Sequence, residues 1–175
     1  CGGALDGTWQ IDGTCVEGDL AAYLAAVPGS PLYACSLIQT ATASMVGTAT
    51  FANGMEIDHL TITFDADTLY TSTCVDTVNG TAVTLDATTC TALQQTLISH
   101  QTLSAAACSF AGGNCACSVS FQVGPPTTPQ AYTISGTKIV YASGSGSMDY
   151  CVSGTTLTTR DAEQHATFYN TAHKL

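Results

Sequence analysis

The sequence predicts a mainly β protein, in which a single antiparallel meander closes into a barrel and carries two short helices and disulfide cross-links. The first observation is composition: Thr, Ser, Gly and Ala dominate, whereas the Lys and Glu residues that usually cover helices are scarce. The second is a series of short segments with alternating apolar residues, separated by tight-turn dipeptides. The third is the presence of nine cysteines in a chain of 175 residues. A meander of many strands usually closes, because closure removes exposed strand edges.

Ten segments are expected to form strands: 7–11, 44–52, 56–64, 68–75, 80–85, 115–123, 131–135, 138–142, 148–152 and 155–159. Asn53-Gly54 and Asn79-Gly80 supply the positive φ angles that a two-residue hairpin turn requires. Ser135-Gly136 and Ser153-Gly154 are connectors of a similar kind. Such short connections predict that consecutive strands are neighbours in the sheet.

Two segments with helical spacing interrupt the meander. The first, 17–27, places Leu20 and Leu24 on one face and stops at Pro28. The second runs from Thr88 or Thr89 to about His100, with the threonine as its N-cap. The longest apolar stretch, 20–27, is far shorter than the roughly 20 residues that span a bilayer, so no transmembrane helix is expected.

The charge balance excludes one class of partner. Lys138, Arg160 and Lys174 are the only basic residues apart from histidine, against thirteen Asp and Glu residues, and the formal net charge is −10. Such a surface repels phosphate backbones, so nucleic acid is not an expected partner. It also disfavours electrostatic docking on anionic lipid headgroups.

The cysteines indicate a compartment. The sequence begins at Cys1 without an initiator Met, as in bacterial lipoproteins, whose precursors are cut immediately before the cysteine that carries the lipid. A lipid on Cys1 leaves eight cysteines for four disulfides, which predicts an oxidising compartment. The alternative is a simple chain boundary, with Cys1 free or in a disulfide. Zinc is not expected, because paired CxxC knuckles are absent.

Pairing each cysteine with its neighbour along the chain would tie each helix or loop to the nearest strand. The expected disulfides are Cys15–Cys35, Cys74–Cys90, Cys108–Cys115 and Cys117–Cys151. No domain boundary is visible. Residues 1–6 are therefore expected to be a lipid-anchored tether, and residues 7–175 a single disulfide-rich domain.

A short motif carries a resemblance to a known fold. Gly7-Thr8-Trp9, on the first expected strand, resembles the Gly-x-Trp signature of lipocalin-like barrels. In those folds a basic residue on the last strand packs over the tryptophan. The resemblance implies that Arg160, which ends the last expected strand, forms a cation–π contact with Trp9 and latches the barrel.

A longer pattern covers nearly the whole chain. Cys1-Gly2-Gly3, the Gly7-Thr8-Trp9 motif followed by Cys15, Cys115-Ala116-Cys117 and the segment 150–157 together resemble cysteine-rich lipoproteins of unknown function from myxobacteria. The chain departs from true lipocalins between residues 74 and 117, where it inserts a helix and four cysteines. The resemblance implies no catalytic residues and no cofactor.

Two acidic groups were weighed as sites. Asp65 and Asp67 can present oxygens to Ca²⁺, but a calcium loop needs more ligands, and a polar hairpin turn is the preferred interpretation. Alternation places Glu56 and Asp58 on one strand face and His59 on the other. Such a carboxylate pair is suited to acid–base work, but a solvated outer face is the preferred interpretation.

The remaining titratable groups favour no chemistry. Asp161, Glu163 and His165 alternate and are interpreted as a charged strand end. No nucleophile elbow, Walker loop or dinucleotide fingerprint is present.

The expected function is therefore non-catalytic. The chain is predicted to be a lipid-anchored protein of the bacterial outer membrane, facing the periplasm or the surface, and a rigid interaction or structural subunit of an envelope assembly. Its expected partners are the membrane, through a lipid on Cys1, and protein subunits. The alternative is a lipocalin-like protein that binds a small apolar ligand or lipid.

Overall fold

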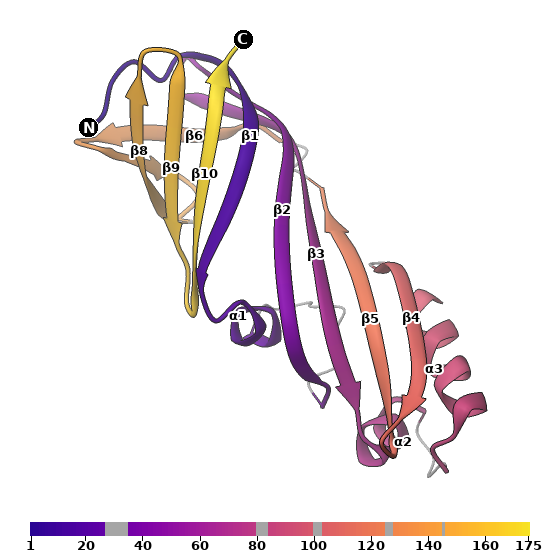
Figure 1. The fold of residues 1–175 in the computed structure, drawn as a ribbon. Coiled ribbons are helices and arrows are strands. Elements are labelled where there is room, and N and C mark those ends of the chain that lie inside the picture. Colours follow the sequence, from indigo (N-terminus) through magenta and orange to yellow (C-terminus); the bar gives the residue numbers. More distant parts are fainter. Residues whose placement is uncertain (27–34, 80–83, 100–102, 125–127, 145) are drawn as a thin grey trace. The chain divides into compact units, whose positions relative to one another are not determined.

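The structure is a computed structural model of residues 1–175, and it describes residues 1–26, 35–79, 84–99, 103–124, 128–144 and 146–175. The described part is mainly β, as predicted (Figure 1). Its strands are β1 (Gly7–Gly18), β2 (Leu37–Ala52), β3 (Met55–Tyr70), β4 (Leu103–Ala111), β5 (Asn114–Val123), β6 (Gln130–Ser135), β7 (Lys138–Tyr141), β8 (Ser147–Ser153), β9 (Thr156–Ala162) and β10 (Ala166–Lys174). The described helices are α1 (Leu20–Ala26), α2 (Ser72–Asn79) and α3 (Ala87–Ser99).

The strands pair in one antiparallel sheet, in the order β2-β1-β10-β9-β8-β7-β6-β3-β5-β4. Because β2 also pairs with β3, eight of the ten strands form a closed ring of pairings, and β5 and β4 continue outward from β3. The predicted meander holds for β6 to β10, which are neighbours in chain order. β1 lies between β2 and β10, so the first and last strands of the chain pair.

The chain folds into two compact units, and each contains separate stretches of the sequence. The ring unit comprises residues 1–18, 43–62 and 123–175. The helical unit comprises residues 19–42 and 63–122. Strands β2 and β3 contribute residues to both units.

The core of the ring unit is built from the inward-facing residues of its strands. Asn53 (φ 53°) and Gly54 (φ 73°) turn β2 into β3 with positive φ at both positions, as predicted. Trp9, Phe51 and Ile139 are almost completely buried, and the Phe51 and Tyr132 rings meet edge to face with centroids 5.6 Å apart. The buried cluster consists of Leu5, Trp9, Ala49, Phe51, Tyr132, Ile139, Tyr150, Leu157 and Ala172.

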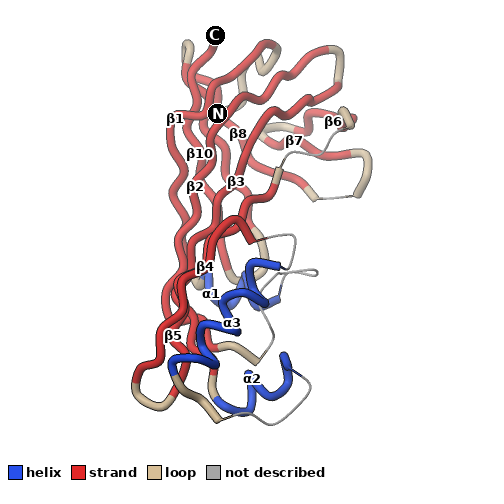
Figure 2. The backbone as a smooth tube through the Cα atoms, turned by 90° about the vertical axis from the view of Figure 1, so that its right-hand side faces the viewer, coloured by secondary structure: helices blue, strands red, loops and turns tan. Residues whose placement is uncertain are grey.

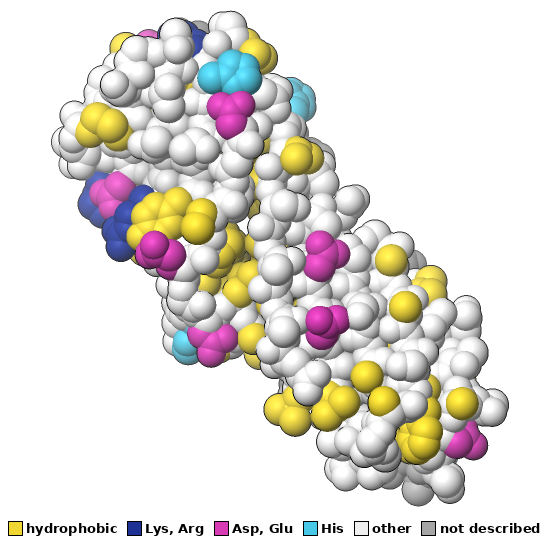
Figure 3. All heavy atoms as spheres, in the orientation of Figure 1, with side chains coloured by type: hydrophobic (Ala, Val, Ile, Leu, Met, Phe, Trp, Pro, Cys, Tyr) yellow, Lys and Arg dark blue, Asp and Glu magenta, His cyan; other side chains and the backbone are white. Residues whose placement is uncertain are grey.

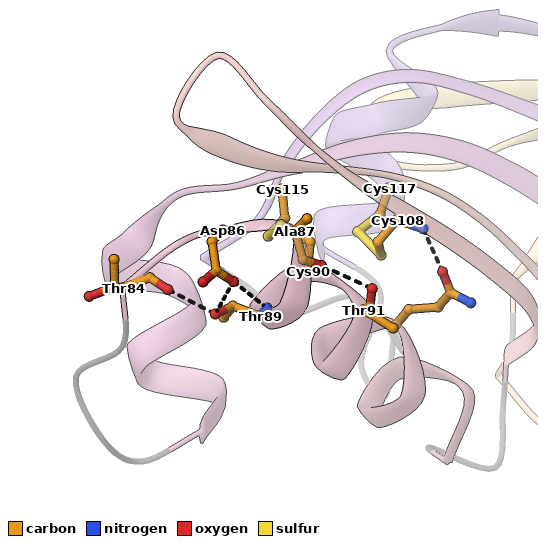
Figure 4. Close-up of a disulfide and its surroundings, with 10 residues drawn as sticks. Thr84, Asp86, Ala87, Thr89, Cys90, Thr91, Cys108, Cys115 and Cys117 are labelled. Atoms are coloured by element: carbon orange, nitrogen blue, oxygen red, sulfur yellow. Dashed lines mark hydrogen bonds between the residues drawn. A yellow bond between two sulfur atoms is a disulfide. The ribbon is translucent and has the colours of Figure 1, made fainter.

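In the helical unit, the three helices lie on the same side of the strands (Figure 2). Leu93 and Leu97 of α3 are fully buried. The N-cap of α3 is Asp86, whose Oδ1 accepts the backbone N–H of Thr89 at 2.8 Å, so the predicted threonine cap is wrong (Figure 4). Asp19 caps α1 in the same way, accepting the Ala22 N–H at 2.9 Å. None of the described helices is long and apolar enough to cross a membrane.

The secondary structure differs from the prediction in several places, and in two of them a residue expected elsewhere lies in another element: Glu17 lies in β1 and Asn79 ends α2. The strand expected over 68–75 stops at Tyr70, and α2 begins at Ser72. We attribute this difference to burial, because Cys74 and Val75 are almost fully buried within α2. The burial of these two side chains outweighs the preference of the segment's β-branched residues for strands. Strands β4 and β10 were not predicted. Most of the strand expected over 80–85 lies outside the described residues.

Candidate functional site

Four disulfides form, the number that was predicted, but every predicted pair is wrong. The bonds are Cys1–Cys151, Cys35–Cys74, Cys90–Cys115 and Cys108–Cys117, and Cys15 is the free, exposed cysteine. Sheet register explains the difference. Cys108 lies opposite Cys117 in the β4–β5 hairpin with their Cα atoms 4.1 Å apart, whereas Cys115 lies opposite Phe110 and bonds to α3 (Figure 4).

Cys1 belongs to the disulfide framework. Its Sγ is bonded to the Sγ of Cys151, so the prediction that Cys1 stands outside the disulfides is wrong. A sulfur in a disulfide cannot also carry a thioether-linked lipid. The disulfide and the expected lipid anchor are therefore alternative states of the same atom.

Residues 1–6, expected to be a tether, are packed on the ring unit and are called the N-terminal strap below. Leu5 is 5% exposed and belongs to the buried cluster. Four strap carbonyls accept hydrogen bonds: Gly2 from Val152 N (2.8 Å), Gly3 from Tyr150 Oη (3.3 Å), Leu5 from Trp9 Nε1 (2.7 Å) and Asp6 from Lys174 Nζ (2.7 Å).

A cation does lie over Trp9, but it is Lys174 and not Arg160. Trp9 pairs with Lys174 across β1 and β10, and the Lys174 Nζ lies 5.5 Å from the centroid of the Trp9 ring. Arg160 lies opposite Tyr169, five positions along β10 from Lys174 and thus roughly 16 Å away at 3.3 Å per residue. The prediction failed because β10, the true last strand, was not recognised.

Arg160 belongs instead to a chain of polar contacts on the outside of the ring unit. Its guanidinium contacts Asp149 Oδ2 at 3.3 Å, and Asp149 also pairs with Lys138 at 3.3 Å. Arg160 Nε donates to Tyr169 Oη, which donates to Glu17 at 3.0 Å. These contacts link β1, β10, β9, β8 and β7, and the basic and acidic side chains gather together in Figure 3. They are exposed, so each contributes little to stability.

The ring unit also buries a pair of carboxyl groups. Glu56 is 5% exposed, so the interpretation of Glu56 and Asp58 as an outer face is wrong. Glu56 is hydrogen-bonded to Asp58 and accepts a hydrogen bond from Tyr141. His59 lies exposed on the opposite face, as alternation predicted.

Burial controls the protonation of this pair. Desolvation, followed by the charge of Asp58, raises the pKa of Glu56 to about 7. Burial also raises the pKa of Asp58, although the hydrogen bond from Glu56 opposes this rise. Burial therefore favours the uncharged form of both carboxyl groups. A carboxylic acid that titrates near neutral pH is able to exchange protons, but this one is closed off from solvent.

One signal in the sequence could have revealed the buried pair. Phe64 lies on the same face of β3 as Glu56 and Asp58, at even spacing, and it is buried. Asp161 on β9 shares the inward face with Leu157, and burial, then the charge of Glu163, raises its pKa.

The other predicted residues are dispersed. Asp65 and Asp67 are exposed within β3 and form no turn. Asp67 accepts hydrogen bonds from Ser118 and Thr40, both at 2.7 Å, which lower its pKa. Both aspartates line an open groove of about 410 Å³ in the helical unit.

The histidines build no site among the residues that the structure describes. His173 contacts Asp12 at 2.7 Å, His165 is exposed, and His100 lies outside the described residues. No group of three or more metal-ligating side chains occurs in the described ranges.

Comparison of the chain with protein-family models, with curated proteins and with solved structures found no match.

Proposed function

We propose that the protein is an extracytoplasmic protein of the cell envelope that acts as a rigid, non-catalytic interaction or structural subunit. One observation carries this proposal: large side chains pack against one another inside the ring unit, with Trp9, Phe51 and Ile139 almost completely buried in a single cluster. Such a packed cluster favours the outer faces and the loops as the places of contact with partners.

The disulfides support an oxidising compartment. Three of them cross-link the helical unit, and the fourth ties the N-terminal strap to β8. Such bonds persist outside the cytoplasm and are rare within it. They also resist unfolding and proteolysis, as a permanent building block requires.

Exposed apolar side chains support a role in docking. Val46 and Ile57 are 61% and 41% exposed in the ring unit, and Leu37 and Phe110 are 60% and 44% exposed in the helical unit. Exposed apolar side chains are available for contact with another protein, and they mark an interaction surface where they adjoin one another. The net charge of −10 favours a partner with a basic surface.

An anchor on Cys1, and with it an outer-membrane location, is proposed only for molecules in which the Cys1–Cys151 bond is absent. The mass of the intact native protein distinguishes the two states. Loss of two hydrogens per disulfide marks the bridged form, and added acyl mass on the N-terminal peptide marks the anchored form.

A lipocalin-like protein that binds a small apolar ligand or lipid is the second candidate. It is favoured by the closure of eight strands into a ring, with Trp9 on the first strand beneath Lys174 on the last. In this alternative the ring is a barrel with a ligand site inside it.

A binding titration and a cross-linking experiment separate the candidates. The native, oxidised protein is titrated with a fatty acid and with an apolar fluorophore while the emission of Trp9, the only tryptophan, is followed. In parallel, cross-linking in intact envelopes tests for a complex of defined stoichiometry. No saturable ligand signal together with a discrete complex supports the structural role. Saturable binding of one ligand per chain without a complex supports the alternative.

A further inference from the structure

The N-terminal strap covers one end of the buried cluster in the ring unit. Leu5 packs within that cluster, and its carbonyl accepts the Trp9 indole N–H. The strap passes close to β8, where Gly2 forms a parallel bridge with Cys151. A Cβ on Gly3 would lie 3.0 Å from the Val152 Cβ, so the strap backbone touches the ring unit directly. Trp9 is therefore shielded from solvent partly by residues 1–6.

The covalent bond that holds the strap is the most accessible of the four disulfides. Cys1 is exposed and Cys151 is half-buried. Each of the other three bonds has at least one cysteine that is no more than 2% exposed: Cys74, Cys115 or Cys117. A reductant reaches exposed disulfides first, and exposed bonds are typically the labile ones.

The contacts that remain after reduction hold the strap only weakly. They consist of one buried side chain, Leu5, and a few hydrogen bonds made by strap carbonyls. Ordering six residues opposes these contacts with a free energy of similar size. The disulfide therefore decides whether the strap stays in place.

We propose that the N-terminal strap is a redox-sensitive cover, which reduction of Cys1–Cys151 by a dithiol releases from the Trp9 end of the ring unit. The reaction is a thiol–disulfide exchange. The dithiol supplies two electrons and two protons and becomes a disulfide, while Cys1 and Cys151 become thiols. Release uncovers the apolar end that Leu5 fills, and the three disulfides of the helical unit stay intact.

Graded reduction of the full chain tests this proposal. The protein is treated with increasing dithiothreitol, alkylated, and mapped by peptide mass spectrometry, while acrylamide quenching of Trp9 is measured in parallel. We expect Cys1 and Cys151 to be the first pair alkylated, and the quenching constant of Trp9 to rise severalfold over the same dithiol range. The Cys15→Ser variant is the background for these measurements, because it removes the one free thiol and prevents exchange through it.

Two variants complete the test. The double variant Cys1→Ser, Cys151→Ser is expected to show the high quenching constant without reductant, with unchanged far-ultraviolet circular dichroism. The matched control Cys35→Ser, Cys74→Ser removes a disulfide of the helical unit and should leave Trp9 quenching as in the parent. The proposal is overturned if Trp9 stays protected when Cys1 and Cys151 are fully alkylated, or if Cys90 and Cys115 are reduced first. Both outcomes are read on the Cys15→Ser background, in which all eight disulfide cysteines are kept, so they stand even where a double variant fails to fold.

Discussion

At the scale of a single residue, Glu56 makes the stability of the protein depend on pH. Burial raises the pKa of its carboxyl from 4.5 to about 7, and the groups that face it are Asp58 and Tyr141. The folded state thus binds a proton that the unfolded state has already released between these two values. The stability that this proton provides is fully present below pH 4.5 and is lost as the pH rises through about 7.

We predict that Glu56→Gln flattens this pH dependence, because glutamine keeps a hydrogen-bond donor and carries no charge. Relative to the parent, the variant should gain up to about 3 kcal/mol in free energy of unfolding between pH 4.5 and pH 8. Urea denaturation across this range measures the difference. Asp67→Asn is the control, because hydrogen bonds lower the pKa of the exposed Asp67 carboxyl, and it should leave the slope intact. Equal slopes for the parent and Glu56→Gln would contradict the buried pair.

Trp9 and Lys174 are the second feature at this scale. The Lys174 ammonium stacks over the indole and donates to the Asp6 carbonyl, so one side chain joins β10, β1 and the N-terminal strap. We predict that Lys174→Ala lowers the free energy of unfolding by about 1–2 kcal/mol. Arg160→Ala, the matched removal of an exposed cation, should lower the free energy of unfolding by less than Lys174→Ala does, because the contacts of Arg160 are exposed to solvent. Denaturation followed by Trp9 fluorescence measures the free energy of unfolding of both variants. A larger loss of stability for Arg160→Ala than for Lys174→Ala would support the Trp9–Arg160 contact predicted from the sequence.

At the scale of elements, α3 depends on a cap outside its own range. Asp86 Oδ1 accepts both the backbone N–H and the hydroxyl of Thr89. Farther along α3, Gln94 Oε1 accepts the N–H of Cys108 at 2.9 Å, so this helix also satisfies a donor on β4, the outermost strand of the sheet. The helix thus satisfies one backbone donor of this edge strand.

We predict that Asp86→Ala lowers the free energy of unfolding, because it removes the side chain that caps the N-terminus of α3. Thr88→Ala is the control, because Thr88 is exposed and its substitution should change the stability by less than about 0.5 kcal/mol. Thermal and urea denaturation measure both variants. A larger effect of Thr88→Ala would place the cap where the sequence alone predicted it.

The elements that could be predicted are those whose signal is local. The hairpin at Asn53-Gly54 needs only two positive φ angles, and these residue types supply them. In contrast, α2 forms although its segment is rich in β-branched residues, because Cys74 and Val75 are buried there. The partners of the cysteines depend on sheet register, which residues distant in sequence determine, so pairing neighbours failed for Cys108. That Glu56 faces inward could be predicted only from its even spacing to Phe64, which places both residues on the same face of β3.

At the scale of the whole molecule, the basic residues are unevenly divided between the two units, although the formal net charge of the two units is the same. Lys138, Arg160 and Lys174 all belong to the ring unit, and the helical unit contains no Lys or Arg. The helical unit carries instead three of the four disulfides and an open groove lined by Asp65 and Asp67.

Disulfide mapping of the native protein, digested without reduction and with free thiols blocked at the start, tests the account most directly. The account predicts four cross-linked peptide pairs, Cys1–Cys151, Cys35–Cys74, Cys90–Cys115 and Cys108–Cys117, with the blocking group on Cys15 alone. Cys1–Cys151 is the decisive pair, because it closes the N-terminal strap over Trp9 and joins residues 150 positions apart. A Cys15–Cys35 peptide, or a lipid on Cys1 together with a blocked Cys151 thiol, would contradict it.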